Sequence, residues 1–221
     1  MQDCEIVVFL GPSLAREKAE QILKADYRPP ARRGDIYKAA KEGARIICLI
    51  DGVFFQDCSV AHKEVIHALQ AGAKVLGASS MGALRASELD VYGMQGIGAI
   101  YQAYRSGHLE SDDEVALVFD PFSFEPRSEP LVNIRFNLDL AWQKGVISVT
   151  SKDRLFHIAS AIYFPERTYE RMFSDAQGSV SEDEMNSLRN YLAKEMRDFK
   201  MEDAVIALEK VKKMAEEMKC S

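Results

Sequence analysis

The chain has 221 residues, enough for one hydrophobic core or for one domain with a substantial addition. Its composition, 47% hydrophobic and 28% charged, is typical of a soluble globular protein. The formal net charge of -6 argues against a broad surface for nucleic acid or for an anionic membrane. No apolar stretch is long enough to span a bilayer, and the acidic start MQDCE differs from the basic start of a secretory signal. We therefore expect a cytoplasmic protein without a nucleic-acid or membrane partner.

The four cysteines are scattered and show no C-x-x-C spacing, so neither a zinc site nor a thioredoxin-like motif is expected. They are Cys4, Cys48, Cys58 and Cys220. Cys48 lies in an apolar run and is predicted to be a small buried hydrophobic residue. We expect neither a metal ion nor a cofactor.

The first half of the chain alternates between short apolar strands and helices. Strands are predicted at residues 5–10, 45–50, 75–78 and 115–119, and helices at about 14–25, 35–43, 59–71 and from residue 80 onward. Residues 93–98 are predicted to be a glycine-rich joint between helices, since their G-x-x-G-x-G spacing lacks the preceding strand of a dinucleotide-binding loop. Alternating strands and helices predict an α/β core over residues 1–120, with a Rossmann-like parallel sheet flanked by helices.

Residues 121–221 are predicted to form a mainly α-helical C-terminal region packed on the core. After an irregular, proline-containing crossing, helices are predicted at about 137–144, 153–163, 182–197 and 202–219. The third begins with a capping box, Ser181 to Glu184. The expected roles of this region are covering the sheet, contacting partners, or homo-oligomerisation.

Polar or small residues follow three of the predicted strands. These residues are Gly11-Pro12-Ser13, Asp51-Gly52 and Ser79-Ser80. Right-handed crossovers place the carboxyl ends of parallel strands on one edge of the sheet, where open α/β sheets bind their ligands. The three loops are therefore expected to meet there, and this convergence is the main functional signal.

The stretch from Lys74 to Leu89 predicts a strand, a tight turn and a helix, with a hydroxyl group at the turn. Its A-x-S-x-G pattern around Ser80 is one residue away from the nucleophile-elbow pattern G-x-S-x-G. Ser80 would lie at a helix N-terminus, where N–H groups and the helix dipole favour an oxyanion. The alternative is that Ser80 is only the N-cap of the helix.

Asp51, His62 and Ser80 would supply an orienting carboxylate, a base and a nucleophile, in an order that is one known solution of the triad geometry. His62 is in the first turn of its helix, near the sheet edge, whereas His67 would point away from that edge. Glu64 shares the first turn and is a further candidate. For Asp51, capping the following loop is an equal alternative.

Other charged and nucleophilic residues near this edge are candidates for weaker roles. Arg85 could pair with a substrate carboxylate or with Glu88. Arg32 and Arg33 could clamp an anionic tail, although the alternative that they are only surface charges is slightly favoured. Cys58, just before a helix, is the alternative nucleophile. Asp112-Asp113-Glu114 could bind a divalent ion, although capping is favoured.

Six sequence blocks resemble the TfuA-like family of proteins over roughly the first 120 residues, whereas the C-terminal part matches only loosely. The blocks are VFLGPSL at 8–14, PPARRGDI at 29–36, IDGVF at 50–54, HKE at 62–64, GASSMGALRASEL at 77–89 and DDEVAL at 112–117. Within these blocks, we expect the substrate to be bound by Gly11, Ser13, Arg33, Asp35, Ser79, Gly82 and Arg85.

The resemblance implies a partner of a YcaO enzyme, which uses ATP to activate a peptide amide for thioamidation, as in thioglycine formation in methyl-coenzyme M reductase and in ribosomal natural products. It further implies release of sulfide from a thiocarboxylated ubiquitin-like sulfur carrier. Such hydrolysis is acyl transfer, which suits either Ser80 as the nucleophile or a water activated by the base. The alternative is an adaptor that docks the carrier onto YcaO without catalysis. A nucleotide-binding activator is disfavoured because no Walker or dinucleotide loop is found.

Overall fold

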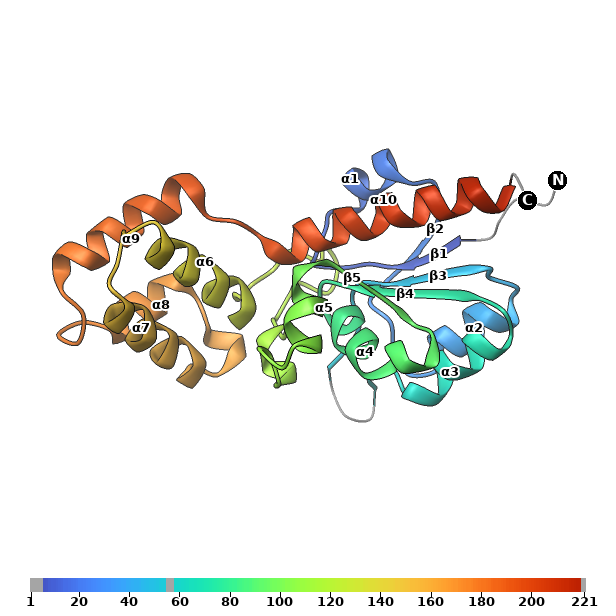
Figure 1. Cartoon of the computed structure of the whole chain (residues 1–221), viewed down its shortest axis with the longest axis horizontal. Coiled ribbons are helices and arrows are strands. Elements are labelled where there is room, and N and C mark those ends of the chain that lie inside the picture. Colours follow the sequence, from blue (N-terminus) through green and yellow to red (C-terminus); the bar gives the residue numbers. More distant parts are fainter. Residues whose placement is uncertain (1–5, 55–57, 220–221) are drawn as a thin grey trace. The chain divides into compact units, whose positions relative to one another are not determined.

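The structure is a computed structural model that describes residues 6–54 and 58–219 (Figure 1). It divides into two compact units, the first formed by Met1–Asp112 with Lys200–Ser221 and the second by Asp113–Phe199. This division differs from the predicted one in two ways: the chain leaves the first unit after Asp112, and its last helix returns to that unit. The pattern of an amphipathic helix shows that it has an apolar face but does not identify what covers that face.

The first unit contains the predicted Rossmann-like sheet, and its strands are all parallel. The strands are β1 (Ile6–Phe9), β2 (Asp26–Arg28), β3 (Ile46–Leu49), β4 (Lys74–Ala78) and β5 (Gln95–Ile97), in the order β2-β1-β3-β4-β5. In this doubly wound order the connections change direction between β1 and β3, which is where such sheets form a ligand-binding crevice. The carboxyl ends of β1 and β3 therefore have the greatest functional interest.

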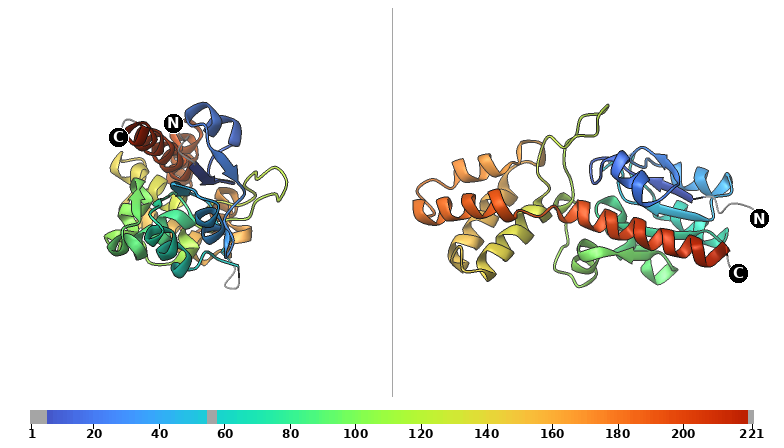
Figure 2. Two further views of the ribbon diagram at one scale, coloured as in Figure 1. Left: turned by 90° about the vertical axis from the view of Figure 1, so that its right-hand side faces the viewer. Right: turned by 90° about the horizontal axis from the view of Figure 1, so that it is seen from above.

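Helices cover both faces of the sheet (Figures 1 and 2). One face carries α2 (Asp35–Lys41), α3 (His62–Gln70) and α4 (Met81–Leu89), and the other carries α1 (Arg16–Ile22) and α10 (Phe199–Lys219). Neighbouring strand residues enter opposite cores, Val8 beneath α1 and α10 and Phe9 beneath α2 to α4. Burial on both faces explains why the strands read as continuous apolar runs. Cys48 is fully buried, as predicted, and this burial raises the pKa of its thiol to about 12.

Two glycines allow α4 to begin directly against the sheet. A Cβ atom on Gly82 would lie 1.8 Å from the carbonyl oxygen of Leu49, and a Cβ atom on Gly77 would lie 2.2 Å from the carbonyl oxygen of Gly82. The Gly82 amide also donates a hydrogen bond of 3.2 Å to the carbonyl of Ile50. The turn between β4 and α4 is therefore fixed by backbone contacts on both sides.

Two predictions about short elements were wrong, and one strand was not predicted. The expected joint at 93–98 contains strand β5, in which Gly96 pairs with Gly77 of β4. Strand β2, paired with β1, follows the first helix where no strand is predicted. The expected strand at 115–119 is irregular and lies in the second unit. Strands of three residues such as β2 and β5 carry too little apolar periodicity to be recognised. In the apolar run at 115–119, Val115 and Ala116 are buried, and Phe119 forms an isolated bridge with Pro126 instead of extending a strand.

The second unit is helical, with one core of its own. Its helices are α6 (Leu131–Gln143), α7 (Val149–Ala161), α8 (Tyr169–Asp175) and α9 (Glu182–Glu195). The side chain of Ser181 accepts a hydrogen bond from the amide of Glu184 at the start of α9, as the capping box predicted. A mainly α-helical C-terminal part is thus confirmed.

A buried carboxylate joins α10 to the rest of the first unit. Asp203 accepts hydrogen bonds from the amides of Ala99 and Ile100 (2.8 and 2.9 Å), at the start of α5 (Gly98–Arg105). A Cβ atom on Gly98 would lie 2.1 Å from the Asp203 carboxyl carbon, so the glycine makes room for this contact. Asp203 therefore caps a helix more than a hundred residues away in sequence.

We expect Gly82→Ala to lower the free energy of unfolding by about 3 kcal/mol or more, because the new methyl group would overlap the Leu49 carbonyl. Urea denaturation would measure this. Gly72→Ala is the matched control: nothing lies within 4 Å of its added Cβ, and its positive φ of 90° alone should cost about 1 kcal/mol. Equal losses in the two variants would contradict the close approach of α4.

We expect the stabilising contribution of Asp203 to depend on pH. Burial raises the pKa of Asp203 to about 6, so the folded state binds this proton more tightly than the unfolded state. The contribution is then fully present below about pH 4 and is lost as the pH rises through about 6. Relative to Asp203→Asn, the wild-type chain should lose up to about 3 kcal/mol of unfolding free energy between about pH 4 and pH 7, measured by urea denaturation. A difference that stays constant over this range would contradict the prediction.

Candidate functional site

The loops that follow β1 and β3 meet through the carboxylate of Asp51. One carboxylate oxygen accepts hydrogen bonds from the amides of Gly11 and Ser13, at 2.8 and 3.1 Å. The other accepts a hydrogen bond of 2.6 Å from the Ser13 hydroxyl. Asp51 is buried, and it therefore bridges the two strand ends at the point where the sheet connections change direction.

The loop after β4 joins the same network through Ser79. The Ser79 hydroxyl donates a hydrogen bond of 2.8 Å to the Ser13 hydroxyl, which in turn donates to Asp51. We call Ser79, Ser13 and Asp51 the hydroxyl chain. Ser79 has a φ of 65°, in the left-handed region that glycine adopts most easily. The predicted convergence of three loops at this edge is thus present in the structure.

Ser80 occupies the N-cap position of α4, at the strand–turn–helix junction that the sequence indicated. Its side chain makes no capping hydrogen bond, so its hydroxyl does not play the alternative role considered for it. The residue is 2% exposed, and its backbone carbonyl accepts hydrogen bonds from Ala83 and Leu84 in the first turn of the helix. The junction therefore holds Ser80 at the amino end of α4, next to the hydroxyl chain.

His62 lies at the first position of α3 and pairs with Glu88 of α4. Its Nε2 atom is 2.9 Å from a carboxylate oxygen of Glu88, which also accepts a 2.6 Å hydrogen bond from Arg85. Within residues 6–54 and 58–219, no hydrogen bond joins His62 to Asp51 or to Ser80. Glu88 thus lies beside the imidazole, where the sequence predicts Asp51. For Glu88 itself, the sequence predicts only a pair with Arg85.

A cleft of about 430 Å³ is lined in part by Arg85 and Glu88. Arg85 reaches it while its Nε donates a 2.8 Å hydrogen bond to the carbonyl of Val60, which fixes the direction of the side chain. The cleft combines one guanidinium with several carboxylates and an apolar wall, and it is lined by Phe54, Ser59, Met81, Leu84, Arg85, Glu88, Glu110, Ser111 and Asp112.

Glu64 is occupied by backbone amides. It accepts hydrogen bonds from Ala61, Gly34 and Ile36 at 2.7, 2.9 and 3.2 Å, and it is buried. Through these contacts it caps α3 and holds the start of α2. This arrangement explains the position of Glu64 without a role in catalysis.

The remaining predicted binding residues are two glycines at close contacts and two residues of the loop before α2. Gly11 and Gly82 serve close packing, since a Cβ atom on Gly11 would lie 2.4 Å from the Pro30 side chain. Asp35 accepts a hydrogen bond of 2.8 Å from the amide of Arg32 in the loop before α2. The amide of Arg33 donates a 2.7 Å hydrogen bond to the carbonyl of Cys58, an exposed cysteine. Cys4 and Cys220 lie outside the described residues.

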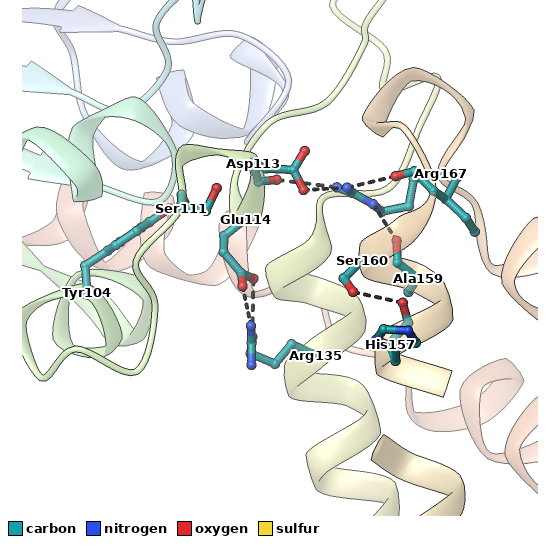
Figure 3. A network of polar contacts seen from close by, with 10 residues as sticks. Tyr104, Ser111, Asp113, Glu114, Arg135, His157, Ala159, Ser160 and Arg167 are labelled. Carbon is teal, nitrogen blue, oxygen red and sulfur yellow. Dashed lines mark hydrogen bonds and ion pairs between the residues drawn. The ribbon is translucent and has the colours of Figure 1, made fainter. Parts of the chain in front are cut away.

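Two residues of the acidic run at 112–114 pair with arginines. Asp113 accepts a hydrogen bond of 2.5 Å from the buried Arg167, and Glu114 pairs with Arg135 (Figure 3). In the part of the chain that the structure describes, no group of three or more histidine, cysteine or acidic side chains is arranged to hold a metal ion. Likewise, none of the described helices combines the length and the apolar composition that a membrane crossing needs.

The fold and this edge define a doubly wound α/β protein with a polar site at the carboxyl ends of its strands. The family model described as TfuA-like protein matches residues 51–168, more than half of the 221 residues. The chain therefore belongs to the TfuA-like family, a family associated with YcaO enzymes. The match includes Asp51, His62 and Ser80, whereas Ser13 precedes it. A comparison with curated proteins found no match.

We expect Glu64→Gln to lower the free energy of unfolding by about 2 kcal/mol, because an amide cannot accept hydrogen bonds on both ends as the carboxylate does. Urea denaturation would measure the loss. The matched control is Glu17→Gln in the first turn of α1, an exposed position at which the change should be within about 0.5 kcal/mol. A stability equal to that of the wild type would contradict a capping role for Glu64.

Proposed function

We propose that this protein is the partner of a YcaO enzyme in peptide backbone thioamidation and that it acts in the cytoplasm. In this proposal it releases sulfide by hydrolysing the C-terminal thiocarboxylate of a ubiquitin-like sulfur-carrier protein. Membership of the TfuA-like family supports the partnership. The observation that carries the hydrolysis is the strained β4–α4 turn, which places a serine hydroxyl at the amino end of a helix.

The chemistry is acyl transfer from sulfur to oxygen. The Ser80 oxygen attacks the carbonyl carbon of the thiocarboxylate and forms a tetrahedral oxyanion, and its proton passes to a base. The protonated base then returns this proton to the sulfur as the carbon–sulfur bond breaks, and hydrosulfide leaves. Water hydrolyses the resulting serine ester, which gives the carrier carboxylate and restores the Ser80 hydroxyl. The amino end of α4 favours the negative charge that develops on the carbonyl oxygen. In a second version, the base activates a water molecule that attacks directly.

We assign the base to His62 and its orientation to Glu88. A carboxylate 2.9 Å from Nε2 fixes the orientation of the ring, so that Nδ1 is the nitrogen that accepts the serine proton in this proposal. Asp51 then has a different task from the one predicted, because its oxygens already accept three hydrogen bonds from the β1 loop. The imidazole acts on Ser80 directly or through one water molecule.

Two arginines are proposed to hold the carrier terminus. Arg85 offers a guanidinium whose direction is fixed by Val60 and Glu88, and Arg33 lies in a loop tied to Cys58. Guanidinium groups match the planar geometry of carboxylate and thiocarboxylate ends. An extended C-terminal tail would suit a cleft of about 430 Å³ better than a folded surface would.

A second candidate function is an adaptor that docks the carrier onto YcaO without catalysis. The observation in its favour is burial, since Ser79 is 0% and Ser80 is 2% exposed. A nucleophile so enclosed reaches a substrate only when binding opens a path to it. The adaptor requires no such path.

We expect Ser80→Ala to reduce sulfide release from a thiocarboxylated carrier at least about a hundredfold, because the attacking oxygen is lost. Sulfide would be measured with the purified protein and carrier in the absence of YcaO. Ser87→Ala is the matched control, because it removes another hydroxyl from α4, and its rate should equal that of the wild type. Among the described residues, this hydroxyl is hydrogen-bonded to the carbonyl of Leu84 alone.

Undiminished release in Ser80→Ala would remove Ser80 from the mechanism and leave an activated water. Carrier binding by the wild-type protein without release above the spontaneous rate would favour the adaptor.

A further inference from the structure

We infer that the hydroxyl chain of Ser79, Ser13 and Asp51 positions Ser80 for attack. This inference rests on the proposed function and names residues that act through the nucleophile rather than on the substrate. The chain links the carboxyl ends of β1, β3 and β4 through side chains that are all at most 2% exposed. Since these side chains are buried, we assign them no contact with the substrate, and their role is to fix the conformation of the β4–α4 turn.

The direction of the chain is set at Asp51. Both oxygens of this carboxylate accept hydrogen bonds, and one of them accepts a 2.6 Å hydrogen bond from the Ser13 hydroxyl. The Ser13 oxygen can therefore accept a hydrogen bond from the Ser79 hydroxyl, with 2.8 Å between the two oxygens. The charge on Asp51 thus fixes both hydroxyl protons and holds the side chain of Ser79 toward β1.

The backbone of Ser79 is the part of the turn that the chain controls. Its φ of 65° is unfavourable for a residue with a Cβ atom, and among the described residues only Phe124 is another non-glycine with positive φ. Glycine would adopt this conformation at lower cost but would lack the hydroxyl. The hydrogen bond to Ser13 therefore offsets a strained conformation at the residue just before Ser80.

The rest of the junction cannot compensate for a change at Ser79. The start of α4 is fixed against the sheet by Gly77 and Gly82, whose added Cβ atoms would overlap neighbouring backbone atoms. A rotation at Ser79 would therefore move Ser80 relative to the amino end of α4. Misplacement of a reacting group by about 1 Å can reduce a rate about a hundredfold.

The decisive variant is Ser79→Gly, which removes the hydroxyl and also relieves the strain of the positive φ. We expect kcat for sulfide release to fall at least about tenfold, KM to stay within about twofold, and the melting temperature to stay within about 4 °C of the wild type. Ser13→Ala breaks the chain at its middle and should lower kcat by a similar factor. Kinetics on the full chain with a thiocarboxylated carrier, together with thermal unfolding, would measure these quantities.

A purely structural role for the chain would not give this result. It predicts that Ser79→Gly, as a stable variant, keeps the wild-type kcat. Ser87→Ala serves again as the serine control and should match the wild type in kcat, KM and melting temperature.

The outcomes separate this inference from the function on which it rests. Release by the wild type that is lost in Ser80→Ala but unchanged in Ser79→Gly and Ser13→Ala would overturn the positioning role alone. No release by the wild type would overturn the proposed function and the positioning role together. A lower kcat in both chain variants with KM unchanged would support both.

Discussion

The carboxylate of Asp51 is the contact on which the candidate site depends. A buried carboxylate is costly unless donors surround it, and here two amides and one hydroxyl from the β1 loop supply them. These bonds hold the ends of β1 and β3 together at the one place in the sheet where the chain connections diverge. Doubly wound sheets commonly bind ligands in a crevice at this position, and in this protein the buried carboxylate of Asp51 lies there.

The second constraint is the close approach of α4 to β3 and β4. Without side chains at Gly77 and Gly82, backbone meets backbone, and the helix begins immediately after the strand. The two serines between them must then complete a sharp turn within the residues available. One of them takes the left-handed conformation and the other becomes the N-cap. The conformation of the turn at the candidate site therefore follows from how closely α4 packs on the sheet.

Much of this arrangement could be predicted from the sequence because it depends on local patterns. Continuous apolar runs identified β1, β3 and β4, since strands buried on both faces need no polar residues. Parallel connections then required that Ser13, Asp51 and Ser79 lie on the same edge. The structure joins these residues by hydrogen bonds of 2.6 and 2.8 Å.

The partners of single side chains could not be predicted in the same way. Whether His62 faces Asp51 or Glu88 depends on how α3 and α4 are rotated about their axes, and spacing along the chain does not contain that angle. The place of α10 depends on which apolar face it covers, and its contact with α5 through Asp203 spans more than a hundred residues. The short strands β2 and β5 exist because a neighbouring strand is there to pair with them, rather than through their own composition.

The proposed role of Ser80 depends both on a local sequence pattern and on a tertiary contact. The turn that presents it follows from local sequence, whereas the imidazole assigned to activate it is held by a helix-to-helix contact at the surface of the first unit. Because Ser80 is enclosed and the His62 imidazole is about half exposed, the proposed reaction requires that substrate binding open a path to the hydroxyl. In the proposed function that substrate is the extended tail of a carrier ending in a thiocarboxylate, which is narrow enough to use such a path.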